Sequence, residues 1–216
     1  MTGTLSGAAD PEMLAIALRS SAGAAFAVTL LGIALVATGC RLAVSALGVC
    51  GALLLAVAFT LTGHTSTSPQ RILAAPLLGS HVLIVQFWLG AVVGLYIACA
   101  HESGTAAARI VARFSAVAVW VVPGLFVAGV VLTILLVPNL AVFRQPYGEL
   151  LLTKASLFAL LLGFAAVNKW RLGPGLAAGG AGVARFRSVV AVEYLLICAV
   201  LAATAIMTGL YSPEAA

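Results

Sequence analysis

Charged residues are scarce in this sequence. Only 8% of its 216 residues are Asp, Glu, Lys or Arg, whereas 63% are hydrophobic. A soluble domain carries about a quarter charged residues, so this chain has too little polar surface for a water-soluble globule. Its net charge of +5 comes from scattered Lys and Arg rather than from a basic run. Without such a run, nothing indicates a nucleic-acid partner.

Groupings typical of catalysis or of thiolate metal sites are also missing. No CxxC pair, no Ser/His/Asp set, no phosphate-binding glycine loop and no paired carboxylates occur, so we do not expect an enzyme. The cysteines lie in or at the ends of apolar segments: Cys40, Cys50, Cys99 and Cys198. We interpret them as small buried hydrophobic residues.

The abundant feature is long apolar blocks, each of the length that a helix needs to cross about 30 Å of hydrocarbon. These blocks predict an all-α fold, a polytopic transmembrane bundle of about six helices. We place the helices at residues 14–39, 42–62, 72–100, 114–137, 149–168 and 188–210. Three domains follow: a short external segment at 1–13, an N-terminal helical hairpin at 14–62, and a membrane domain at 63–213.

Basic residues in the connecting loops predict the orientation. Loops on the cytoplasmic side of a membrane are enriched in Lys and Arg. One set of connections holds seven basic residues: Arg41, Arg109, Arg113, Lys169, Arg171, Arg185 and Arg187. The opposite set holds only Arg71 and Arg144, and Lys154 just inside the predicted helix 149–168 brings that side to three. We therefore expect the first set in the cytoplasm and both termini outside.

Two histidines are the candidate metal ligands. His81 lies within the predicted helix 72–100, and a neutral imidazole there can bind copper, zinc or haem iron, or relay protons. A histidine that only bonds to a neighbouring helix is an equally good interpretation. His64 precedes His81 by 17 residues, in the polar loop that leads into the same helix. That loop can bring both side chains to one external mouth of the bundle.

The presence of other ionisable residues inside predicted spans needs an explanation, because a charged side chain is energetically costly in a bilayer. Glu193 is expected about one turn into the last helix, where the default is a structural ion pair with a cation such as Arg113. Asn168 lies close to the same depth. Lys154 is near the opposite, external face, so depth argues against a Lys154–Glu193 bridge. Arg19 is expected near the external end of the first helix, and both it and Lys154 are expected to extend outward.

Four motifs in order resemble the bacterial copper resistance D (CopD) family. The first is Gly63-His64 followed by SHVLIVQFWLGAVVGL from Ser80. The second is RFSAVAVWVVPGLFVAGVV from Arg113, and the third is YGELLLTKASLFALLLGFAAVNKWRLGP from Tyr147. The fourth, VEYLLICAVLAATAIMTGLYSP from Val192, carries Glu193. The resemblance covers about residues 60–213.

This resemblance implies a multi-pass protein of the cytoplasmic membrane that moves copper ions. The family commonly works beside a small extracytoplasmic copper-binding protein. By the motif match, His64 and His81 are the carried-over metal ligands. Lys154 and Glu193 become pathway or structural positions, and we place Arg113 and Asn168 with them because of their expected depth beside Glu193.

Two functions of other classes stay open at this stage. A b-type cytochrome would need two axial haem ligands, which here means His81 with His64, or one of these with Met207. A structural or assembly subunit of a larger membrane complex would need no chemistry of its own, and the scarcity of polar groups fits that role.

Overall fold

The computed structural model describes residues 10–63, 66, 68–137 and 139–211. These residues are helical or lie in turns, and no strand occurs among them. The elements are α1 Pro11–Arg19, α2 Ser21–Leu42, α3 Ser45–Thr60, α5 Arg71–His101, α6 Gly104–Leu136, η2 Leu140–Arg144, α7 Pro146–Val167, η3 Asn168–Leu172, η4 Gly173–Ala178 and α8 Ala181–Leu210. The all-α helical bundle predicted from the sequence is thereby confirmed.

Each of the six predicted spans has a counterpart. In the described residues, α2, α5, α6, α8 and the segment Pro146–Ala178 are long and apolar enough to cross a bilayer. The sixth, α3, is an apolar helix of 16 residues. The chain is therefore a multi-pass membrane protein.

Several helix ends differ from the prediction. The first span is broken at Ser20, whose extended backbone (φ −82°, ψ 171°) ends α1 and caps α2. Arg19 consequently closes α1 instead of lying inside a continuous span. Helix α6 begins at Gly104, where the Ser103 side chain accepts a bond from the N–H of Ala106. Capping and short-range backbone bonds form these ends, and hydropathy does not register them.

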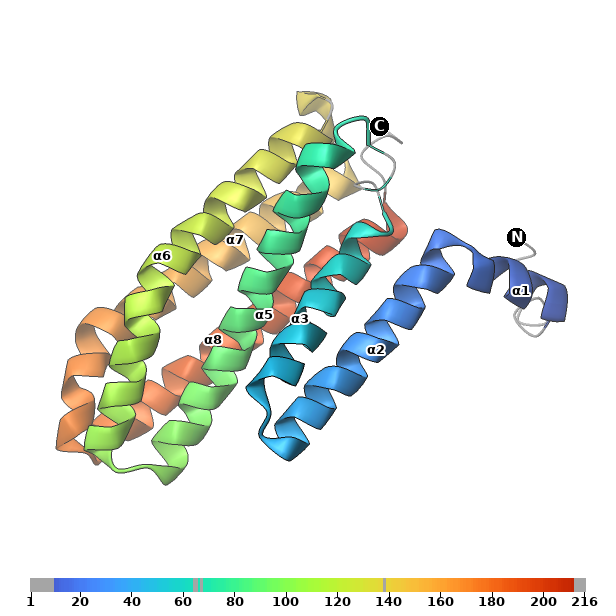
Figure 1. Cartoon of the computed structure of the whole chain (residues 1–216). Coiled ribbons are helices and arrows are strands. Elements are labelled where there is room, and N and C mark those ends of the chain that lie inside the picture. The colour runs from blue at the N-terminus through green and yellow to red at the C-terminus, as the bar shows by residue number, and fades with distance from the viewer. Residues whose placement is uncertain (1–9, 64–65, 67, 138, 212–216) are drawn as a thin grey trace. The chain divides into compact units, whose positions relative to one another are not determined.

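The chain divides into two compact units, Met1–Leu83 and Ile84–Ala216. In the first unit α2 and α3 pack side by side as a hairpin (Figure 1). A Cβ atom built on Gly51 would lie 2.6 Å from the carbonyl oxygen of Gly32, so the two backbones touch at this point. Ala43 makes the turn between the helices in the left-handed conformation, at φ 55°.

The second unit contains the end of α5 together with α6, α7, η3, η4 and α8, and Figure 1 shows its long helices roughly aligned. Helices α7 and α8 pack together, and η4 packs against α6. Aromatic and branched side chains from all four long helices fill the core, among them Trp88, Val92, Val111, Leu161 and Phe186. A smaller cluster of Val142, Tyr147 and Met207 lies where α7 begins.

Candidate functional site

A cavity of about 470 Å³ lies inside the second unit. Its walls come from α5, α6, α7, η3 and α8, and most are apolar. The apolar lining includes Leu95, Val111, Phe114, Val122, Leu162, Phe186 and Val190. The polar lining consists of Trp88, Ser115, Asn168, Lys169 and Glu193. A mainly apolar pocket of about 300–1,000 Å³ with a few polar groups is typical of a small-molecule site.

One hydrogen bond organises the polar side of this cavity. The side-chain amide of Asn168 donates to Oε1 of Glu193 over 2.6 Å. Glu193 is 4% exposed and Asn168 is 7% exposed, and they are the two buried polar or charged residues of the described chain. Because α8 begins at Ala181, Glu193 lies about 18 Å along the helix. It is therefore much deeper in its helix than the single turn that the sequence predicted.

Asn168 occupies a special position in the backbone. It begins the π-helical turn η3, in which its carbonyl accepts from the N–H of Gly173, five residues on. Single π-helical turns inside α-helices are rare and frequently occur at functional sites. The α-helical hydrogen-bond pattern of α7 ends at Val167, where this turn begins. The Asn168 side chain then contacts Glu193 of α8.

Two polar atoms of the cavity lining have no hydrogen-bond partner among the described residues: Nε1 of Trp88 and Oδ1 of Asn168. The Trp88 side chain is 4% exposed and packs edge-on against Phe158. Buried polar atoms are nearly always paired with protein or water. Both atoms are shielded from the open space of the cavity, and no described group pairs with them.

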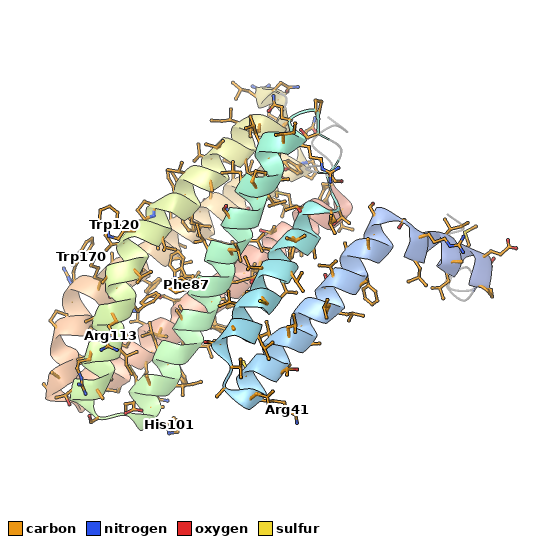
Figure 2. All side chains as sticks on the ribbon, in the orientation of Figure 1. Arg41, Phe87, His101, Arg113, Trp120 and Trp170 are labelled. Atoms are coloured by element: carbon orange, nitrogen blue, oxygen red, sulfur yellow. The ribbon has the colours of Figure 1, made fainter. Side chains whose placement is uncertain are left out.

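The cavity reaches the surface of the bundle between α6 and η3. Val119 and Trp170 line it and are exposed, Trp170 to 71%. Figure 2 shows Trp170 and Trp120 projecting outward from the bundle on the same side of this view. A second cavity of about 500 Å³ shares four lining residues with the first: Val111, Ser115, Val119 and Lys169.

The expected cation beside Glu193 is not found. Within the described residues Glu193 makes no ion pair, and its bond to Asn168 takes that place. Arg113 is an exposed residue of α6. Lys154 is half-buried on α7, about 21 Å along the helix from Asn168. Glu193 bonds to Asn168, at the opposite end of α7 from Lys154.

Of the two predicted metal ligands, the structure describes only His81. His64 lies outside the described residues, and His81 is a half-buried residue of α5 in the first unit. His101 ends α5 and is exposed. A search of the described residues finds no group of three or more His, Cys, Asp or Glu side chains that could hold a metal ion. The prediction of a His64/His81 site therefore stays a prediction.

Sequence reasoning missed the contribution of the aromatic residues. Trp88 lines the cavity. The guanidinium of Arg187 lies 4.7 Å from the ring centroid of Tyr96 and donates from Nη2 to the Tyr96 hydroxyl over 3.2 Å. The spacing of seven residues from Trp88 to Leu95 was the available signal, because it places both on one helix face.

Comparison with known proteins gives one match. Residues 108–207 match the family model of copper resistance protein D. The matched segment holds all of the second and third motifs and most of the fourth, with Asn168 and Glu193 among its residues, whereas His64 and His81 precede it. No curated protein and no solved structure matches the chain. This match confirms the resemblance to the copper resistance D family that the order of the motifs predicted.

Proposed function

We propose that this protein moves copper ions across the cytoplasmic membrane through a site that contains His81 and His64. The observation that carries the proposal is the family match over residues 108–207, which supports a membrane protein of copper resistance. An intramembrane histidine supports it, because ionisable side chains within spans commonly mark ion pathways. Copper is here the cargo of the protein.

The position of His81 suits the capture of a metal ion. It lies ten residues after Arg71, about 15 Å along α5, and is half-buried. A neutral imidazole nitrogen is a good ligand for copper. Two imidazoles leave further coordination positions open, and a small extracytoplasmic copper-binding protein could fill these while it delivers the ion. The seven basic residues in the predicted cytoplasmic loops favour an external position for this end of α5.

The cavity of the second unit supplies further candidate pathway residues. Trp88 lines the cavity that contains Asn168 and Glu193. We assign these two as pathway residues, since oxygen ligands inside a span can meet a cation. Lys154 and Arg113 have structural roles in this proposal.

Histidine substitutions test the metal site. We expect purified wild-type protein to retain copper after dialysis, and His81→Ala and His64→Ala to lose most of it. His101→Ala is the matched control, because this third histidine is exposed at the end of α5. Cells that express the two site variants should also differ from wild type in copper content. Unchanged copper binding and unchanged copper content in both variants would disprove the proposal.

The same samples test the two alternative classes. A Soret band in the absorption spectrum of the purified protein would show bound haem. It would therefore support b-type haem electron transfer instead of copper transport. Stoichiometric protein partners that co-purify without any bound metal would instead support an assembly subunit of a membrane complex. Copper without a Soret band supports transport.

A further inference from the structure

An open groove runs along the second unit between α6 and the η3–η4 segment. It is the cavity of about 500 Å³ that shares four lining residues with the cavity beside Trp88. Its walls are mostly small or apolar, and Ala112, Ala116, Val119 and Pro174 in them are exposed at the surface of the bundle. Both walls belong to segments that are long and apolar enough to lie in a bilayer. Lipid chains therefore have direct access to the groove.

Lys169 is the one charged residue in the lining of this groove. Its depth follows from two close approaches between the walls. A Cβ atom built on Gly173 would lie 3.9 Å from Cγ1 of Val111, and one built on Gly104 would lie 2.6 Å from the carbonyl oxygen of Leu176. From Lys169 to Leu176 the chain thus runs beside α6 toward the first residue of that helix. Lys169 consequently lies deeper in the bundle than η4 does.

The charge of Lys169 has no carboxylate beside it. The side chain is half-buried, and its contact among the described residues is with the ring of Trp170, whose centroid lies 6.0 Å from Nζ. It forms no ion pair in this part of the chain. A charged side chain within a span needs a partner or must extend to the interface. An anion at the groove would supply that partner.

A second cation flanks the groove nearer to the membrane surface. Arg109 is exposed on α6 and precedes Ala116 by seven residues, so it lies on the same side of the helix as that lining residue. Helix α6 has 33 residues and is therefore about 50 Å long, whereas the hydrocarbon core is about 30 Å thick. The first turns of α6 consequently reach the head-group region, and Arg109 lies within them.

The charge at this end of the second unit is one-sided. Six basic residues lie in or beside the described connections from α5 to α6 and from α7 to α8: Arg109, Arg113, Lys169, Arg171, Arg185 and Arg187. Glu102 is the one exposed acidic residue of these connections. Clusters of Lys and Arg at a membrane surface attract anionic lipids, and basic pockets between spans bind their head groups.

We propose that this groove binds an anionic phospholipid, with an acyl chain along α6 and the phosphate between Lys169 and Arg109. The apolar walls contact the chain, and the two cations donate charge-assisted hydrogen bonds to the phosphate oxygens. Trp170, beside Lys169, is an aromatic residue of the kind that lies at head-group level. A zwitterionic phospholipid carries its own cation and gains less from this site. The site contains no histidine and does not depend on the copper proposal.

Quenching of Trp170 by lipids with brominated acyl chains tests this site in the full chain, reconstituted in phosphatidylcholine vesicles. In a Trp120→Phe protein the remaining indoles are Trp170, which is 71% exposed, and Trp88, which is 4% exposed, so the quenching reports mainly on Trp170. We expect brominated phosphatidylglycerol to quench more strongly than brominated phosphatidylcholine at the same mole fraction. Lys169→Gln should weaken the apparent affinity for phosphatidylglycerol about fivefold, the loss for one basic residue near a membrane surface.

Arg171→Gln is the matched control. It removes the same charge two residues away, but residues two apart in a helical turn do not face the same way, and Arg171 lines neither cavity. Arg109→Gln, at an exposed position, covers the case in which Lys169→Gln disturbs folding, and it should give the same loss. The proposal is overturned if the two phospholipids quench equally. It is also overturned if Arg171→Gln weakens binding as much as Lys169→Gln and Arg109→Gln do, or if none of the three changes it.

Discussion

Asn168 and Glu193 join the end of the third motif to the start of the fourth. The amide of Asn168 donates to Oε1 of Glu193 over 2.6 Å, and this bond ties the π-helical turn η3 to α8. Both residues lie within the copper resistance D match. A neutral amide thereby satisfies one oxygen of a buried carboxyl group where an arginine or lysine was expected. The other oxygen remains available to the cavity.

Substitution of Glu193 should show how much the Asn168–Glu193 hydrogen bond contributes to the stability of the fold. We expect Glu193→Ala to lower the free energy of unfolding by about 1–3 kcal/mol, because the Asn168 amide is left buried without its acceptor. Glu193→Gln should lose less, since its amide oxygen can still accept. Thermal unfolding in detergent, followed by circular dichroism, measures both. Equal stability of the two variants would show that the bond contributes nothing.

Tyr96 should hold Arg187 through both its hydroxyl and its ring. Tyr96→Phe removes the 3.2 Å bond from Nη2 but keeps the ring, and we expect a loss of about 0.5–1.5 kcal/mol. Tyr96→Leu also removes the cation–π contact, which adds about 0.5–1 kcal/mol. A double-mutant cycle with Arg187→Gln isolates the pairwise energy. A coupling energy of zero would contradict the contact.

Gly51 should tolerate no side chain. An added Cβ would meet the backbone oxygen of Gly32 at 2.6 Å, and backbone atoms cannot rotate away. We expect Gly51→Ala to separate α2 from α3 and to destabilise the hairpin by about 1–3 kcal/mol. Gly48→Ala is the control on the same helix, because a Cβ there meets nothing within 4 Å. Thermal unfolding of both variants gives the comparison, and equal midpoints would contradict the close contact.

Loop accessibility tests the predicted orientation. In a protein that lacks its four native cysteines, Ala141→Cys should react in intact cells with a membrane-impermeant maleimide. Glu102→Cys should react only after the cells are permeabilised, because it lies among the connections rich in Lys and Arg. Both positions are exposed. The reverse labelling pattern would place both termini in the cytoplasm.

Much of the fold could be predicted from the sequence, because spans are set by composition and length. Five segments and α3 match the six predicted helices, since each apolar block must satisfy its backbone bonds internally in lipid. The helix ends were less predictable. Ser20 interrupts a continuous apolar stretch, and Gly104–Arg113 is helical despite its polar residues. Side-chain caps decide such ends.

The sequence by itself determined that this chain is a multi-pass helical membrane protein that resembles the copper resistance D family, because hydropathy and the order of motifs can be read directly along the chain. It also singled out Glu193 and Asn168 as residues of similar depth. Only the tertiary structure decided that they bond to each other and that Trp88 shares their cavity. Such pairings depend on helix rotation and on the π-turn at Asn168, and neither of these follows from a residue's depth.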